Sequence, residues 1–181
     1  MNNTEITIEI SETDYKAATT MAGQTLAKFA GNPGYYTNSY NSHLRGKIGE
    51  IAWAKWFADQ GIDVERLYED SALIANADLI LKDEQEHRIE VKTWDERWWK
   101  DLGRCIAVSQ LPKLQKKVDL VIWCVSPTNL QSGALVRLVG WSTVEDVAAA
   151  PKKYTGPKNR RQVHNYQLDQ ENLREMTSLL D

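Results

Sequence analysis

The sequence predicts an α/β protein with a mixed central β-sheet flanked by helices on both faces. Three observations predict this class. Segments of strand character alternate along the chain with segments of helical periodicity. The run from Asp119 to Val125 is almost continuously apolar, as in a central strand that is buried on both faces. A chain of 181 residues with 42% hydrophobic content can bury one substantial core, so we expect a single domain over residues 1–181.

The elements follow one another with recognisable starts and stops. Residues 5–10 alternate between polar and apolar, which predicts a strand with one buried face, and a helix capped by Ser11 or Thr13 is expected to run to Ala30. Residues 31–41 are rich in turn formers and tyrosine and predict a loop. A helix is predicted at 42–60, with Gly61 directly after its end, and strands are predicted near 64–68, 77–81 and 88–93.

The second half of the chain continues the alternation. A hairpin tip or loop at 94–103 and an extended piece at 104–108 are expected to precede a helix at 109–117 that is capped by Ser109. Strands at 119–125 and 133–141 and a short helix at 142–149 should follow. A basic loop at 151–161 and an amphipathic helix from about 169 to 180 complete the prediction.

Charge and composition exclude several classes of protein. The net charge of −3 argues against a protein that coats nucleic acid by bulk electrostatics, although a local basic groove stays possible. No apolar run approaches the roughly 20 residues that span a bilayer, and the N-terminus carries no signal-peptide core, so we expect no membrane partner. Cys105 and Cys124 lie far apart in apolar surroundings, which predicts buried free thiols in a reducing compartment. The expected location is the cytoplasm, and the host cell cytoplasm if the protein is phage-encoded.

Two neighbouring predicted strands carry the side chains most suggestive of chemistry. Residues 76–81 have the sequence Asn-Ala-Asp-Leu-Ile-Leu, and residues 88–93 have the sequence Arg-Ile-Glu-Val-Lys-Thr. Because alternate side chains of a strand share a face, Glu90 and Lys92 project together, away from the apolar core. Asp78 joins them from the preceding strand. The ordinary alternative is an exposed strand face with a salt bridge, and Glu-x-Lys by itself indicates no more than that.

A third carboxylate, Glu50, is expected on the apolar side of the helix 42–60. Its neighbours three, four and seven residues later are Trp53, Ala54 and Phe57. A charge in such a position is costly unless a cation or a hydrogen-bond donor compensates it. The alternative is a glutamate at the boundary whose carboxylate reaches water or an arginine.

These residues suit a hard divalent cation. Asp78 and Glu90 would repel each other at short range unless a cation neutralised both. Mg²⁺ takes oxygen ligands and keeps several waters, and Mn²⁺ could substitute. The backbone carbonyl of Val91 could supply a further oxygen. Lys92 would then orient or help to deprotonate the attacking water and steady the phosphate.

The ordered set of a Gly-Glu pair on a helix, an Asp in a strand and Glu-x-Lys in the next strand resembles the PD-(D/E)XK phosphodiesterase superfamily, the restriction-endonuclease-like nucleases. The resemblance covers about residues 42–125. It implies a restriction-endonuclease-like core in that range, built on a mixed four-stranded sheet, with residues 5–30 and 133–181 as elaborations, and Mg²⁺-dependent cleavage of DNA. It makes Asp78 and Glu90 the acidic pair, Lys92 the lysine and Glu50 the helical glutamate. Ala77 stands where the nominal motif has proline.

Candidate substrate contacts lie outside the acidic motif. Gln110 resembles a polar residue that many such enzymes carry on the helix after the motif, although a plain helix-terminal glutamine is an equal alternative. Arg45 precedes Glu50 and could flank the same cleft, as could His43 and Lys47. The segment 151–161 has five basic and no acidic residues, which suits contacts to a nucleic-acid backbone; the alternative is a solvated flexible loop. Its basic residues are Lys152, Lys153, Lys158, Arg160 and Arg161.

The sequence therefore favours a metal-dependent DNA endonuclease with a Mg²⁺-activated water. One alternative is a protein of the same fold that binds DNA or another protein without cutting it. Another is a structure-selective junction resolvase, which would be a two-fold homodimer with paired sites.

Overall fold

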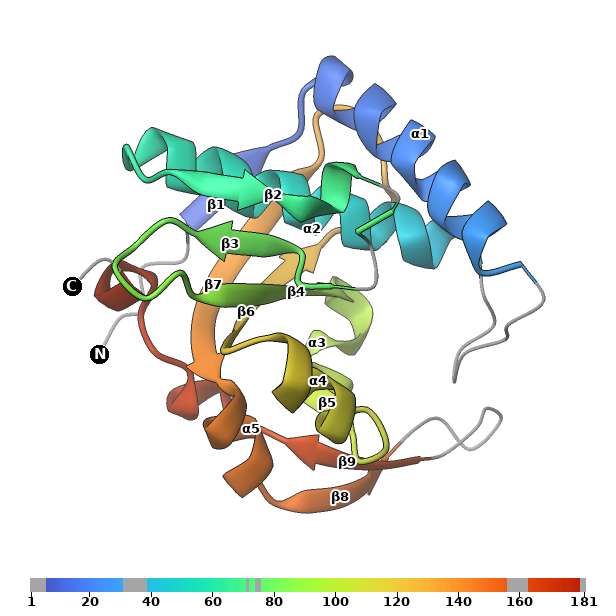
Figure 1. Cartoon of the computed structure of the whole chain (residues 1–181). Helices are drawn as coiled ribbons and strands as arrows, with labels where there is room; N and C mark the ends of the chain where they lie inside the picture. Colours follow the sequence, from blue (N-terminus) through green and yellow to red (C-terminus); the bar gives the residue numbers. More distant parts are fainter. Residues whose placement is uncertain (1–5, 31–38, 71, 74–75, 156–162, 180–181) are drawn as a thin grey trace.

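The computed structural model describes residues 6–30, 39–70, 72–73, 76–155 and 163–179. Figure 1 shows the order of the elements along the chain. The strands are β1 (Ile6–Glu9), β2 (Val64–Arg66), β3 (Leu79–Leu81), β4 (Arg88–Asp95), β5 (Cys105–Ala107), β6 (Leu120–Ser126), β7 (Leu135–Thr143), β8 (Lys152–Thr155) and β9 (Val163–Gln167). The α-helices are α1 (Glu12–Lys28), α2 (Tyr40–Asp59), α3 (Glu96–Leu102), α4 (Leu111–Lys117) and α5 (Val144–Ala149), and three 3₁₀ turns cover η1 (Leu67–Glu69), η2 (Gln170–Asn172) and η3 (Met176–Leu179).

The main sheet has six strands in the order β1-β7-β6-β4-β3-β2. Neighbouring strands in this sheet are antiparallel except for β4 and β6, which run parallel, so the sheet is mixed. The segment α3-β5-α4 connects these two parallel strands, as a parallel pair requires a crossover. A smaller antiparallel sheet has the order β5-β9-β8. The sequence predicted a mixed sheet, and the resemblance implied four strands where the structure has six.

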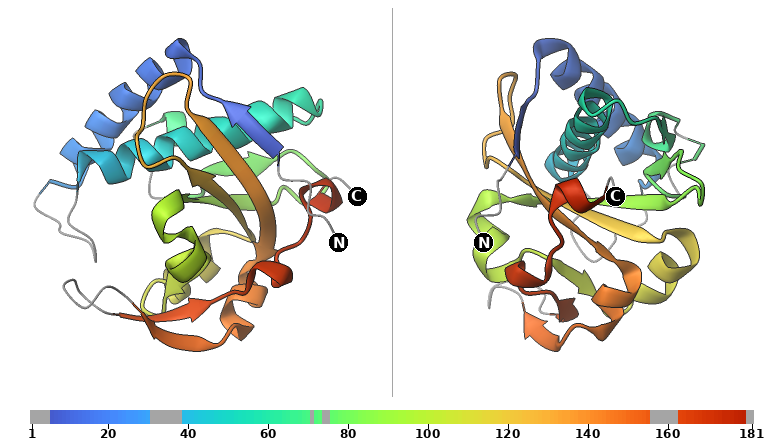
Figure 2. Two further views of the ribbon diagram at one scale, coloured as in Figure 1. Left: turned by 180° about the vertical axis from the view of Figure 1, so that it is seen from behind. Right: turned by 90° about the vertical axis from the view of Figure 1, so that its left-hand side faces the viewer.

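Helices cover both faces of the main sheet, as predicted. Helices α1 and α2 lie on one face, and α3, α4, α5 and the small sheet lie on the other (Figures 1 and 2). Each face of the sheet has its own core: Ile89 and Val91 of β4 pack under α1 and α2, while the core on the opposite face holds Trp123 of β6 and Leu114 of α4. Among the described residues, no helix is long and apolar enough to cross a membrane.

A close approach of α2 to the sheet depends on Gly49. A Cβ atom at this position would overlap the Thr93 hydroxyl and lie 2.8 Å from Cys124 Sγ. The missing side chain therefore lets the helix backbone rest almost directly on β4 and β6. Since Glu50 is the next residue, the same glycine sets how near that carboxylate comes to the sheet.

The prediction of a hairpin tip or loop at 94–103 was wrong. Strand β4 continues to Asp95, and α3 follows at once because the Asp95 side chain accepts a hydrogen bond from the Arg97 N–H as an N-cap. Trp99 then packs into the core beside the small sheet. Helix α2 also begins two residues earlier than expected, at Tyr40, because the Ser39 side chain caps it. The rest of the predicted loop, residues 31–38, lies outside the described residues.

The C-terminal part also differs from the sequence expectation. Residues 152–155 form the strand β8 instead of a loop, because they pair with β9, a strand too polar to be predicted. The expected helix at 169–180 is replaced by the 3₁₀ turns η2 and η3. Between them, Arg174 exchanges backbone hydrogen bonds with Trp141 of β7, which holds the chain extended at that point. Helix α4 begins after Gln110, so Ser109 is not its cap.

Candidate functional site

Asp78 lies directly before β3, and its side chain accepts a hydrogen bond from a backbone N–H of β4. Its backbone N–H donates to the Ile89 carbonyl, and its Oδ2 accepts from the Val91 N–H at 2.8 Å. The N–H and C=O of one strand residue point to the same side, so the Val91 carbonyl also faces the edge where Asp78 lies. The carboxylate thus sits at the point where β3 starts and β4 loses its partner strand.

Glu90 is buried and faces two lysines. Its Oε1 accepts a hydrogen bond from Lys92 Nζ at 2.6 Å, and its Oε2 lies 2.7 Å from Lys117 Nζ. Lys92 shares the face of Glu90 on β4, as the strand alternation predicted, whereas Lys117 reaches in from the end of α4. The face that was predicted to lie away from the core is therefore covered by a helix, and Glu90 is only 8% exposed.

Glu50 is also buried, on the apolar side of α2 as predicted, and it pairs with a lysine on its own helix. Its Oε2 lies 2.7 Å from Lys47 Nζ, three residues earlier. Lys47 is itself buried, donates to the Tyr68 carbonyl and lies 5.6 Å from the centre of the Tyr68 ring. The Tyr68 N–H donates in turn to the backbone carbonyl of Asp78. The turn η1 therefore links the helix that carries Glu50 to the strand that follows Asp78.

The three carboxyl groups affect one another's ionisation. Burial, reinforced by the negative charges of Glu90 and Glu50, raises the pKa of Asp78 well above its usual value. Burial also raises the pKa of Glu50, although Lys47 opposes this shift. Burial acts in the same direction on Glu90, but Lys92 and Lys117 outweigh it and lower the pKa of that carboxyl. Asp78 and Glu50, which resist ionisation, thus lie close enough to Glu90, which is held ionised, for their charges to interact.

The donor set suits a hard cation, although it is not arranged as a finished metal centre. In the part of the chain that the structure describes, no three Asp, Glu, His or Cys side chains are grouped as metal ligands. The buried Oε2 atoms of Glu50 and Glu90 each lie 2.7 Å from one lysine ammonium group. These oxygens, Asp78 and the Val91 carbonyl are the hard ligands that Mg²⁺ prefers. These residues are therefore chemically suited to bind Mg²⁺. In this structure, lysine ammonium groups supply the positive charge beside the carboxylates.

Arg45 belongs to a different cluster. Its guanidinium donates to Ser126 Oγ and to Asp95 Oδ2, both at 2.9 Å, and further to the carbonyls of Pro127 and Thr128. Asp95 also accepts from Arg97 and from the Thr128 hydroxyl. Burial would raise the pKa of Asp95, but these donors and the charge of Arg45 bring it down to about 2. The predicted substrate contact is instead engaged in joining α2 to the ends of β4 and β6.

The other predicted substrate contacts are spread over the molecule. Gln110 is exposed at the start of α4, at the opposite end of the helix from Lys117. Lys152 and Lys153 are exposed on β8, and Lys153 lies 3.8 Å from Asp169. Lys158, Arg160 and Arg161 lie outside the described residues.

The paired strands β8 and β9 carry a row of aromatic and cationic side chains on one face. Lys152 is opposite Tyr166, and Tyr154 is opposite His164. The Tyr154 and His164 rings are 4.8 Å apart, and Lys152 Nζ lies 5.3 Å from the centre of the Tyr166 ring. Tyr154 is 59% exposed, which is unusual for a large aromatic side chain on a strand.

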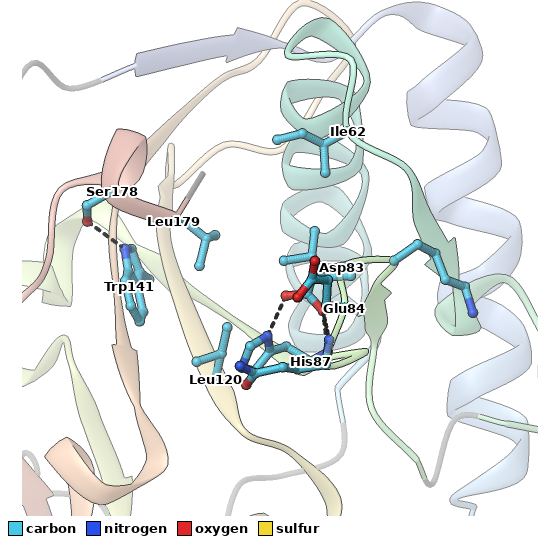
Figure 3. A pocket seen from close by; sticks show the side chains of 11 residues that line it. Ile62, Asp83, Glu84, His87, Leu120, Trp141, Ser178 and Leu179 are labelled. Carbon is cyan, nitrogen blue, oxygen red and sulfur yellow. Dashed lines mark hydrogen bonds and ion pairs between the residues drawn. The ribbon is translucent and has the colours of Figure 1, made fainter. Parts of the chain in front are cut away.

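A cavity of about 470 Å³ lies apart from the carboxylates. It is open at the turn between β3 and β4, where Asp83 bonds to His87, and Trp141 and Ser178 form the facing wall (Figure 3). Leu81, Leu120 and Leu179 give it an apolar lining. None of Glu50, Asp78, Glu90 and Lys92 lines this cavity, so it is not the space around the acidic site.

Two lysines of the site were not predicted to contact the acids. Lys47 was expected only to flank a cleft, and its spacing of three residues before Glu50 on a helix is the signal that indicates an ion pair. Lys117 carries no such local signal. It reaches Glu90 because the crossover from α4 into β6 sets Val121 beside Glu90 in the parallel register.

Comparisons of this chain with protein-family models, curated proteins and solved structures found no match.

Proposed function

We propose that this protein is a Mg²⁺-dependent endonuclease that hydrolyses phosphodiester bonds in DNA. One observation carries the proposal: three consecutive residues of β4 organise the acids. Glu90 is buried between two ammonium groups, the Val91 N–H holds Asp78, and Lys92 donates to Glu90. Groups with strongly shifted pKa values gather at functional sites more often than elsewhere. Burial and neighbouring negative charges raise the pKa of Asp78 well above its usual value, and burial raises that of Glu50.

In this proposal Asp78, Glu90 and the Val91 carbonyl hold the metal ion, with Glu50 as a further carboxylate beside them. A bound Mg²⁺ would supply Lewis acidity and a water of lowered pKa. Lys92 already donates to Glu90, so its ammonium is placed to hold a water or a phosphate oxygen beside that carboxylate. In the hydrolysis, the water gives up a proton as its oxygen bonds to phosphorus, the bond from phosphorus to the leaving oxygen breaks, and the leaving oxygen takes up a proton, so that one water is consumed for each bond cut.

The substrate surface in this proposal includes the β8–β9 pair. Lys152 supplies a positive charge for phosphate, and the exposed Tyr154 offers a ring on which a base or sugar can stack. A cytoplasmic location agrees with the two cysteines, which are free and buried.

Purified protein should be incubated with supercoiled plasmid, branched DNA and RNA, each with Mg²⁺, with Mn²⁺ and with chelator. Nicked or linear plasmid that appears only with the metal supports the proposal. Asp78→Asn should abolish this cleavage, and Asp63→Asn, which changes an exposed aspartate, should leave it unchanged. Equal cleavage by wild type and Asp78→Asn would reject the site.

A DNA-binding role without cleavage is the second candidate, and the lysines favour it. Glu50 and Glu90 already have ammonium partners at 2.7 Å, so the site is partly neutralised without any metal. This function predicts that the protein retains DNA with the same affinity in chelator and in Mg²⁺, and that no substrate is cut. Filter binding under both conditions separates the two candidates.

A further inference from the structure

Three lysines approach the acids, and they are held to different degrees. Lys47 is buried, with 4% of its surface exposed, and has contacts with Glu50, the Tyr68 carbonyl and the Tyr68 ring. Lys92 is fixed at its backbone in the middle of β4 and donates a well-aligned hydrogen bond to Glu90. The Lys47 ammonium would lose several contacts on leaving Glu50, and the Lys92 ammonium would lose its hydrogen bond to Glu90.

Lys117 is held differently because of where its backbone lies. It is the last residue of α4, whereas Lys92 lies within β4. Its side chain is 28% exposed, about as much as that of Lys92 at 29%, and its ammonium lies 2.7 Å from Glu90 Oε2. A long flexible side chain at a helix end can move its charge into water at small cost. Of these three lysines, it is the one whose departure would free a buried carboxylate oxygen while Lys92 keeps the other oxygen of Glu90 in place.

We propose that Lys117 is a displaceable counter-ion of Glu90, which occupies the carboxylate oxygen in the metal-free protein and competes with the divalent cation for it. This inference rests on the proposed function, because it assigns the same acids to the metal. The Lys117 ammonium balances a buried charge that would otherwise destabilise the fold when no cation is bound. It also lowers the affinity of the site for the cation, since both positive charges cannot occupy the same oxygen.

Calorimetric titration with MnCl₂ tests the competition directly, without any nuclease assay. Lys117→Met removes the charge and keeps the length of the side chain, so it should bind Mn²⁺ roughly tenfold more tightly than wild type, because the coupling of a partly exposed pair lies between that of a surface pair and a buried one. Lys116→Met removes the same charge one residue away, from an exposed position, and should change the affinity less than twofold. Lys117→Arg keeps the charge and should stay near wild type.

Thermal unfolding gives a second readout, which also reports on a poorly folded variant. Without metal, Lys117→Met should melt below wild type, because Glu90 has lost one of its two cations. Added Mn²⁺ should raise its melting temperature by more than it raises that of wild type, since tighter binding to the folded state stabilises more.

The outcomes separate this inference from the proposed function. If wild type binds Mn²⁺ and Lys117→Met matches Lys116→Met in affinity and in melting shift, the counter-ion role is overturned and the metal site stands. If Mn²⁺ binds only to Lys117→Met, the competition is supported in its strongest form. If no variant binds Mn²⁺ by either measurement, both the competition and the proposed metal site are rejected.

Discussion

Single residues decide how near the acids of this site come to one another. Gly49 lets α2 rest on β4, and the Val91 N–H holds Asp78 at the sheet edge. Glu90 is then paired with Lys92 on its own strand and Lys117 on a helix. The first two contacts involve the backbone and the last two involve lysine side chains, so substitutions at Gly49 and at the lysines test them separately.

Gly49→Ala should destabilise the protein by about 1–3 kcal/mol, because the added methyl group overpacks against Thr93 and Cys124. The matched control is Gly23→Ala in α1, where an added Cβ meets nothing within 4 Å. That change should stabilise the protein by roughly 0.5–1 kcal/mol, since alanine is the better helix former. Urea denaturation of both variants measures the difference, and equal stabilities would contradict the close approach of α2.

Lys92→Ala should abolish metal-dependent cleavage while the protein stays folded, because Lys117 still compensates Glu90. Circular dichroism and thermal melting establish the fold, and a plasmid assay measures turnover. Lys100→Ala, a change at an exposed lysine of α3, is the control for loss of a positive charge. Undiminished turnover in Lys92→Ala would remove this lysine from the proposed mechanism.

Asp95 makes the free energy of unfolding depend on pH in the acidic range. Its pKa of about 2 in the folded state lies below the value of about 3.9 for an unfolded aspartate. The ionised carboxylate therefore stabilises the fold above about pH 4, by about 2 kcal/mol, and this contribution is lost as the pH falls from about 4 towards 2. Asp95→Asn keeps a residue that can cap α3 but loses the charge.

Urea denaturation at pH 7 and at pH 2.5 should show a gap between wild type and Asp95→Asn that shrinks to roughly a third at the lower pH. Asp63→Asn should follow wild type at both. A gap between wild type and Asp95→Asn that stays constant with pH would mean that the charge of Asp95 does not contribute.

At the scale of elements, the β8–β9 pair contributes an exposed surface that the hydrophobic pattern did not predict. Both strands are short and largely polar, and they become a sheet only because β5 pairs with β9 on its other side. The aromatic and cationic side chains on one face are then aligned by cross-strand pairing. Because the side chains of this surface come from two separate strands, they form no continuous motif in the sequence.

Tyr154→Ala should weaken binding of a single-stranded DNA oligonucleotide by roughly 1–3 kcal/mol, the value of one stacked base, if this face contacts the substrate. Its effect on stability should stay within about 0.5 kcal/mol, because the side chain is mostly exposed. Tyr154→Phe retains the ring and should bind like wild type. Fluorescence anisotropy with a labelled oligonucleotide measures all three proteins, and equal affinity of Tyr154→Ala would exclude the face as a stacking surface.

At the scale of the whole molecule, local patterns predicted the mixed sheet, the helices on both faces and the shared face of Glu90 and Lys92. Period-two alternation fixes which side chains of β4 lie together, and helical periodicity places Glu50 among Trp53 and Phe57. Helix α3 was missed because the capping role of Asp95 depends on where β4 ends. Lys117 was missed because only the crossover between parallel strands brings it to Glu90.

The pairing of β1 with β7 has a consequence for how the chain is made. Ile6 is the partner of Leu138, so β1 can pair only after β7 has been synthesised. Until then Ile10, which is fully enclosed in the finished protein, has nowhere to be buried against the sheet. Contacts between distant parts of a sequence are slow to form. The apolar side chains of β1 therefore wait longer for their partner strand than those of β3, which pairs with the next strand in the chain.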